Sequence, residues 1–276
     1  MTPEGNAGDD KVFSGAIPDI YDRFMVPIFF EPYARDLADR IEALRPQTLL
    51  EVAAGTGVLT RAVASRLDSR ASMVATDLNQ PMLDRARARL GADGRIAWQQ
   101  ADALALPFDD ARFDVVVCQF GVMFYPDKTR GHAEARRVLK PGGRYVFSVW
   151  DGLASNDFAR TVDEALKEFF PRDPPRFTAR TPHGYGDKAA IREAAVAAGF
   201  RSVEIDAVEK STRAGSAGDV AIAVCQGTPL RYEIEARAAS GELPAATRHV
   251  GEALEQRFGP GEIEGRSRAY VIIAIG

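Results

Sequence analysis

The sequence has few of the features that mark disulfide-stabilised, metal-binding or membrane-spanning proteins. Only two of its 276 residues are cysteines, Cys118 and Cys225, and their spacing fits neither a metal site nor a disulfide framework. We therefore expect two reduced, buried thiols and no metal. No run reaches the roughly 18 apolar residues of a membrane helix, and residues 1–10 contain no apolar signal core. These absences favour a cytoplasmic protein without a stable membrane anchor.

The charge balance gives no sign of a nucleic-acid partner. Thirty-five basic residues stand against 39 acidic ones, which leaves a formal net charge of -4, whereas binding to phosphates usually requires a basic face. A hydrophobic content of 46% is ordinary for a globular protein, so the chain can form a sizeable core. We expect a small-molecule ligand and no nucleic acid.

Apolar runs alternate with helix-like patterns through the first half of the chain. Buried strands are expected at 48–53, 72–77, 95–100, 113–118 and 143–150, and helices at 57–67, 80–90 and 127–139. This alternation is typical of an α/β fold with a parallel sheet covered by helices on both faces. Such sheets bind ligands beyond the carboxyl ends of their strands.

Glycine and acidic residues follow the strands at that edge. Gly55 and Gly57 come directly after the strand that ends near Glu51, and glycine lets the backbone approach a ligand closely. Asp77 ends the second strand, where a carboxylate can bind both hydroxyls of a ribose. Asp102 ends the third. A dinucleotide site would need a glycine where this chain has Thr60, which argues against a pyrophosphate ligand.

These residues resemble the class I S-adenosylmethionine-dependent methyltransferases, in particular the branch of ubiquinone and menaquinone biosynthesis enzymes. Residues 20–150 carry the resemblance. Its five motifs, in chain order, are Glu51 to Gly57, Asp77, Asp102-Ala103, Phe113 to Val116, and Val138 to Gly143. One departure is Ala53, where the family commonly has glycine.

The resemblance implies a Rossmann-like seven-stranded, mostly parallel sheet of order 3-2-1-4-5-7-6 with a helical insertion before the last strand. The sixth and seventh strands fit 202–208 and 269–275. We expect an N-terminal arm and helices that cover the active site at 1–44, a methyltransferase core at 45–213, an insertion at 214–265 with two or three helices, and the final core strand at 266–276. The insertion would be a lid or an oligomer surface, which allows a homodimer.

The same resemblance implies S-adenosyl-L-methionine as cofactor and S-adenosyl-L-homocysteine as product. The residues expected to contact the cofactor are Glu51, Ala53, Gly55, Thr56, Gly57, Asp77, Leu78, Asp102, Ala103 and Gln119. Aromatic side chains would form the acceptor site and favour a hydrophobic or aromatic acceptor. These are Tyr21, Phe24, Phe120, Phe124, Trp150 and Tyr185.

Methyl transfer from a sulfonium is an in-line displacement that needs the nucleophile at roughly 3 Å and does not require a base. Of the three histidines, His183 in a glycine-rich loop is the candidate catalytic base, while His132 and His249 are expected at the surface. Three functions stay open: methylation of O, N or C of a small metabolite, methylation of a quinone or lipid precursor, and catalytically silent binding of S-adenosylmethionine.

Replacing Asp77 by alanine tests the cofactor assignment. The variant should bind S-adenosylmethionine much more weakly, because the ribose hydroxyls lose a charged hydrogen-bond acceptor. Isothermal titration calorimetry measures the effect, and unchanged affinity would sink the assignment.

Overall fold

The structure is a computed structural model that describes residues 9–237 and 242–276. Contacts within the chain divide it into two units. The unit that contains most of the sheet comprises Glu31–Trp150, Tyr185–Val208 and Ala269–Gly276, and we call it the sheet unit. The other, which we call the helical unit, comprises Met1–Phe30, Asp151–Gly184 and Glu209–Arg268.

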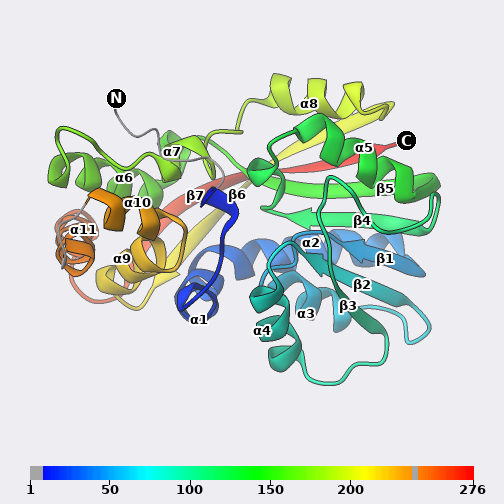
Figure 1. Cartoon of the computed structure of the whole chain (residues 1–276), viewed down its shortest axis with the longest axis horizontal. Helices are drawn as coiled ribbons and strands as arrows, with labels where there is room; N and C mark the ends of the chain where they lie inside the picture. The colour runs from blue at the N-terminus through cyan, green and yellow to red at the C-terminus, as the bar shows by residue number, and fades with distance from the viewer. Residues whose placement is uncertain (1–8, 238–241) are drawn as a thin grey trace. The chain divides into compact units, whose positions relative to one another are not determined.

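Seven strands form one sheet in the order β3-β2-β1-β4-β5-β7-β6, as predicted (Figure 1). The strands are β1 (Thr48–Glu51), β2 (Ser72–Asp77), β3 (Ile96–Gln100), β4 (Phe113–Gln119), β5 (Leu139–Trp150), β6 (Ser202–Ala214) and β7 (Ile263–Ile275). The first five pair in parallel, and β7 runs antiparallel to β5. The carboxyl ends of β1, β2, β3 and β4 therefore meet at one edge of the sheet.

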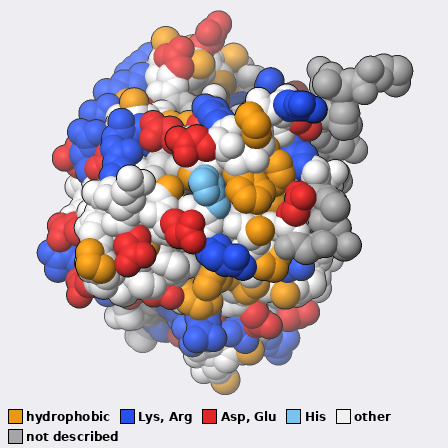
Figure 2. All heavy atoms as spheres, turned by 90° about the vertical axis from the view of Figure 1, so that its left-hand side faces the viewer, with side chains coloured by type: hydrophobic (Ala, Val, Ile, Leu, Met, Phe, Trp, Pro, Cys, Tyr) orange, Lys and Arg blue, Asp and Glu red, His pale blue; other side chains and the backbone are white. Residues whose placement is uncertain are grey.

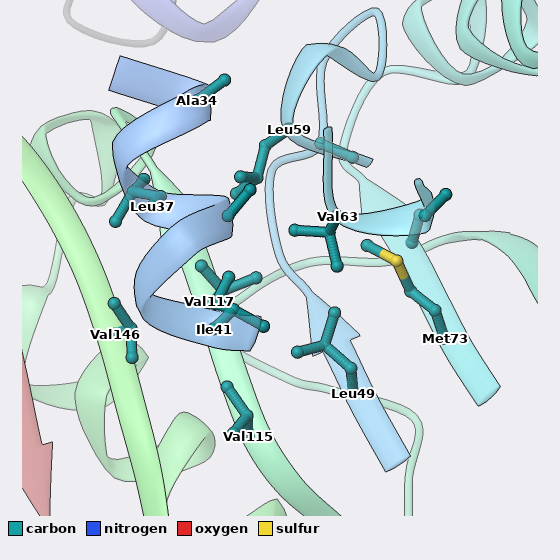
Figure 3. Packing of buried hydrophobic residues seen from close by; sticks show 14 of the residues in the cluster. Ala34, Leu37, Ile41, Leu49, Leu59, Val63, Met73, Val115, Val117 and Val146 are labelled. Atoms are coloured by element: carbon teal, nitrogen blue, oxygen red, sulfur yellow. The ribbon is translucent and has the colours of Figure 1, made fainter. Parts of the chain in front are cut away.

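One face of the sheet is covered by α2 (Glu31–Leu44), α3 (Val58–Ala64) and α4 (Gln80–Leu90). Leu37 and Ile41 of α2 and Val63 of α3 pack with Val115 and Val117 of β4 in one buried cluster (Figure 3). Because side chains alternate across a strand, Val116 and Cys118 point to the other face. Both faces are buried, which explains the continuous apolar run in β4.

The second face is covered by α5 (Lys128–Val138) and α8 (Lys188–Ala197), which lie together beside β5 in Figure 1. Tyr145 and Phe147 of β5 point to this side, and their ring centroids lie 4.7 Å apart. His132 of α5 packs on Phe147 with 4.9 Å between the rings. His132 is 0% exposed, so the prediction that it lies at the surface was wrong. The helix turns it inward, on the same face as the buried Ala135 and Val138.

The helical unit contains helices from three parts of the sequence. They are α1 (Ile17–Ile20), the π-helix η2 (Tyr21–Phe30), α6 (Asp157–Phe169), α7 (Phe177–Arg180), α9 (Ala217–Gln226), α10 (Leu230–Arg237) and α11 (Glu242–Phe258). The last three confirm the helical insertion before the final strand. Short 3-10 turns complete the described chain at Asp9–Lys11, Val122–Phe124 and Leu153–Ser155.

Strands β6 and β7 extend beyond the lengths predicted for them, into the helical unit. Their cross-strand pairs there are polar: Thr212 Oγ1 donates to Ser267 Oγ at 2.7 Å, and Arg213 pairs with Glu264 at 3.2 Å. Strands were recognised in the sequence by their apolar runs, and these polar extensions contain none. The seventh strand therefore begins at Ile263, inside the segment predicted as insertion.

Both cysteines are free and buried, as predicted, one in each unit. Burial raises the pKa of Cys118 in β4 to about 12, and burial likewise raises the pKa of Cys225 in α9 to about 12. Neither thiol therefore ionises near neutral pH. Among the described residues, no helix has the length and apolar character needed to cross a membrane.

Replacing His132 by leucine should stabilise the protein, and more so in acid. Neither ring nitrogen of His132 has a hydrogen-bond partner among the described residues, and an unpaired buried polar group costs about 1–3 kcal/mol. Burial also lowers the pKa of His132 from 6.5 to about 4. The unfolded chain therefore takes up a proton below about pH 6.5 that the folded chain takes up only near pH 4, and stability falls between these values.

Denaturant unfolding at pH 7.5 and pH 5 measures the effect. The advantage of the leucine variant should grow by about 2 kcal/mol between the two pH values, because each pKa unit corresponds to about 1.4 kcal/mol. Parallel pH profiles of variant and wild type would contradict the assignment.

Candidate functional site

A tight turn joins β1 to α3 at the carboxyl edge of the sheet. Ala53, Gly55 and Gly57 all have positive φ, at 56°, 57° and 77°. Gly57 is the residue before the first turn of α3, and a Cβ added there would lie 2.9 Å from Cβ of Ala86 in α4. Only glycine fits both the backbone conformation and the close approach of the two helices. Thr56 beside it is buried, and its Oγ1 has no partner among the described residues.

Glu51 at the end of β1 points into the protein. Its side chain is buried, and its Oε2 accepts a 2.6 Å hydrogen bond from Oγ1 of Thr60 in α3. The Glu51 carbonyl accepts a second bond from Oγ1 of Thr76 at 2.9 Å. Burial raises the pKa of Glu51 to about 8, against the opposing hydrogen bond from Thr60. The carboxyl group thus ties the start of α3 to β1 beneath the glycine turn.

Asp77 at the end of β2 lies beside the same turn. Its Oδ2 accepts from the Gly55 backbone N–H at 2.8 Å, and its Oδ1 accepts from the Asn79 backbone N–H at 2.8 Å. Burial raises the pKa of Asp77, while these two backbone donors lower it. Next to it, Leu78 is 42% exposed, which is unusual for a leucine in this chain. A carboxylate beside an open apolar side chain suits a ribose joined to a flat base.

The end of β3 forms a tight turn. Asp102 Oδ1 accepts from the Leu104 backbone N–H at 2.9 Å, and the Asp102 carbonyl accepts from the Ala105 backbone N–H at 3.0 Å. Asp102 is exposed, and Ala103 follows it in the turn. The Ala101 backbone N–H donates to the Asp77 carbonyl at 3.0 Å, so the ends of β2 and β3 lie side by side.

The end of β4 approaches the glycine turn from the other side. A Cβ added at Gly121 would lie 2.5 Å from Cβ of Ala53, which places the two loops in contact. Gln119 is 9% exposed at the end of the strand. The structure therefore brings together the ends of all four strands on which the predicted cofactor residues lie.

Phe120 and Trp150, two of the predicted acceptor residues, pack on each other. Their rings are stacked 3.8 Å apart with an interplanar angle of 6°, and Tyr33 of α2 meets both edge-on at 5.4 and 5.1 Å. Both are buried, and Phe120 has a φ of 54°. This aromatic cluster supports the loop after β4. Whether either ring also touches an acceptor stays a prediction.

Phe124 and Tyr185, the other predicted acceptor residues of the sheet unit, are half-buried. Lys128 Nζ lies 5.3 Å from the centre of the Tyr185 ring. Burial raises the pKa of Tyr185 to about 12, and its hydroxyl has no hydrogen-bond partner among the described residues. Tyr185 is therefore a neutral phenol with an unused polar end.

The helical unit contains His183, Tyr21 and Phe24. His183 Nδ1 lies 2.8 Å from the carbonyl oxygen of Asp151, which can only accept, so Nδ1 carries the proton and donates. Burial lowers the pKa of His183 to about 4, so the imidazole is neutral. The Asp151 carboxylate is held by Arg268 at 2.5 Å. Tyr21 stacks on Phe30 with 5.1 Å between ring centres, and Phe24 lies under the guanidinium of Arg23 at 4.9 Å.

Three residues that shape these sites were not predicted to do so. Thr60 was used only to argue against a dinucleotide site, which would need a glycine at this position. Its hydroxyl lies three residues after Gly57 and donates to the carboxyl group of Glu51 at the end of β1. Tyr33 was not singled out, because nothing in the sequence around it points to Phe120 or Trp150. Arg268 lies 117 residues from Asp151 in the sequence, and nothing local signals that pair.

The comparisons with known proteins agree with this geometry. The sequence profile of the methyltransferase domain matches residues 49–143. The ubiquinone/menaquinone biosynthesis C-methyltransferase UbiE of Ectopseudomonas mendocina is 31% identical over 207 residues, which cover 70% of this chain and 76% of that protein. The demethylmenaquinone methyltransferase of Clavibacter sepedonicus is 44% identical over 100 residues, but these span only 36% of this chain and 40% of that protein.

A solved structure shows the same fold. The phosphoethanolamine N-methyltransferase 2 of Haemonchus contortus, in complex with S-adenosyl-L-methionine, matches with a TM-score of 0.57 at 18% identity. The match covers 94% of this chain and 56% of that chain. The chain is an S-adenosylmethionine-dependent methyltransferase. Within that class it belongs to the family of the UbiE methyltransferases.

Replacing Thr60 by alanine tests the support under the glycine turn. Removing the donor leaves a buried carboxyl oxygen unpaired, so the free energy of unfolding should fall by about 1–3 kcal/mol. Thr60→Ser keeps the hydroxyl and serves as the matched control, with stability close to wild type. Denaturant unfolding compares the three proteins, and equal losses in both variants would show that the methyl group, not the hydrogen bond, matters.

Proposed function

We propose that this protein transfers a methyl group to a ring carbon of a small, hydrophobic quinol-type acceptor. The observation that supports this choice is sequence similarity: both relatives named above are methyltransferases of quinone biosynthesis by name, and one matches over most of its length. Methylation of O, N or C of another small aromatic metabolite is the broader alternative. The part of this chain that resembles the Clavibacter protein is less than half of that protein.

The residues at the carboxyl edge suit the methyl donor. Asp77 has a carboxylate for ribose hydroxyls, Leu78 offers an apolar surface to a flat base, and the glycine turn holds its backbone in the left-handed conformation beside them. The exposed Asp102 could accept from an exocyclic amine. The buried hydroxyl of Thr56 has no protein partner among the described residues. S-adenosylmethionine supplies the methyl group as a sulfonium, which favours in-line attack by a nucleophile.

A ring carbon becomes nucleophilic when the neighbouring phenolic hydroxyl loses its proton. His183 is the proposed base: its Nδ1–H is fixed by the Asp151 carbonyl, so Nε2 is the nitrogen that can accept a proton. Burial lowers its pKa to about 4, which keeps it neutral at physiological pH but makes it a weak base. As the O–H bond breaks, the proton passes to the imidazole and the electron pair enters the ring. Attack of the ring carbon on the methyl group would release the thioether S-adenosylhomocysteine. Solvent would then take the ring proton, which restores aromaticity, and the imidazolium would return its proton to the phenolate oxygen. Tyr21, Phe24, Phe124 and Tyr185 are proposed as apolar or aromatic surface for the acceptor.

The segments named from the sequence as N-terminal arm, core, insertion and final strand are proposed to keep those roles. A lid or an oligomer surface in the insertion, a homodimer, the absence of nucleic acid as a partner and a cytoplasmic location all stay predictions.

A turnover assay tests the proposal. Wild-type protein with isotope-labelled S-adenosylmethionine and a chemically reduced demethylated naphthoquinol should give a product one methyl group heavier, detected by mass spectrometry. His183→Ala should lower kcat by about 100-fold or more, because a positioned general base typically contributes that much, while cofactor affinity stays unchanged. His249→Ala in α11 is the matched control.

Full turnover by His183→Ala would dismiss the base. Methylation of phenols or amines in the same assay, with the quinol left unchanged, would favour the broader alternative. Cofactor binding without any product in a metabolite extract would favour a silent binding protein.

A further inference from the structure

A groove between α9 and α11 contains none of the residues to which the methyltransferase chemistry is assigned. It has a volume of about 450 Å³ and lies wholly within the helical unit. Small residues from both helices form part of its lining. These are Ala217, Gly218 and Ala221 of α9 and Gly251 of α11. A Cβ added at Gly251 would lie 3.7 Å from Cβ of Ala221, so the two helices are in close contact at this point.

Three charged side chains stand along the rim on α11. Arg248, Glu252 and Glu255 line the groove and are exposed. Their spacing, with Gly251 among them, places all four residues on one face of the helix. None of the three forms an ion pair with another described residue. By contrast, Arg257 on the other side of α11 does have a partner, because it pairs with Glu164 of α6 at 3.4 Å.

The charged residues Arg248, Glu252 and Glu255 face opposite charges when a second copy of α11 lies antiparallel to the first. Consider two antiparallel α11 helices related by a two-fold axis that passes through Gly251. Arg248 is three residues from Gly251, and at a rise of about 1.5 Å per residue it lies about 4.5 Å from the axis, measured along the helix. Glu252 and Glu255 of the second copy then lie about 1.5 and 6 Å from the axis on that same side. Each arginine therefore faces the space between two carboxylates of the other copy.

We propose that this groove and its charged rim form the interface of a two-fold homodimer, in which the partner is a second copy of this chain. A two-fold interface requires a surface that is complementary to itself, and the order Arg, Glu, Glu around a small central residue meets that requirement. Gly251 packs against α9 of its own chain, and its lack of a side chain leaves the charged residues around it as the groups that a second copy would meet. The interface is independent of the proposed acceptor.

Charge reversal in separate copies tests the interface. Arg248→Glu gives three acidic side chains per copy, and the double variant Glu252→Arg with Glu255→Arg gives three basic ones. Wild type should sediment as a dimer at micromolar concentration in analytical ultracentrifugation at low salt. Each variant alone should dissociate at least tenfold more readily, because like charges face each other across the axis.

A mixture of the two variants separates loss of the interface from misfolding. The acidic and basic copies should form a heterodimer that sediments like the wild-type dimer. A misfolded variant would not form this heterodimer. The control variant is Arg35→Glu, which reverses the charge of an exposed arginine on α2 and should dimerise like wild type. The proposal is overturned if wild type is monomeric up to about 100 μM, if Arg248→Glu dimerises like wild type, or if the mixture stays monomeric although both variants are folded by circular dichroism.

Discussion

The contact between the β1–α3 turn and its neighbours is the constraint on which the cofactor edge depends. Gly57 has no side chain because Ala86 of α4 occupies the space that a Cβ would need, and its backbone is left-handed. Below the turn, the buried Glu51 is held by Thr60; above it, Asp77 accepts from the Gly55 backbone N–H. One short segment is thereby fixed by β1, β2, α3 and α4 together. Its backbone geometry is set before any ligand arrives, which lowers the conformational cost of binding.

The burial of Glu51 and Asp77 has an electrostatic consequence. Two carboxyl groups with raised pKa values lie below and beside the same turn, where burial penalises their charged forms. Each is compensated by hydrogen bonds from nearby donors rather than by a fully buried cation. A positively charged ligand next to them would favour their ionised forms. The sulfonium and ammonium groups of S-adenosylmethionine have the sign that such an environment prefers.

The family resemblance was sufficient for the sheet order, and the residues that follow each strand were sufficient to locate the carboxyl edge. Strand β4 could be recognised because both of its faces are buried, and Asp77 because it follows a strand directly. The polar extensions of β6 and β7 could not, since alternating exposed residues resemble a loop. His132 was misplaced because charged neighbours suggested a solvated helix, whereas its position on the helix decides that it is buried. The Asp151–Arg268 pair depends on tertiary structure alone.

The two cysteines, one in each unit, have a practical consequence. With a pKa of about 12, each thiol is almost entirely un-ionised at neutral pH, and its burial excludes reagents from the folded state. Alkylation of the native protein must then wait for a local opening around the residue. The labelling rate of Cys118 therefore reports how often the centre of the sheet opens, and that of Cys225 how often α9 does. The natural sequence thus already contains a separate stability probe for each unit.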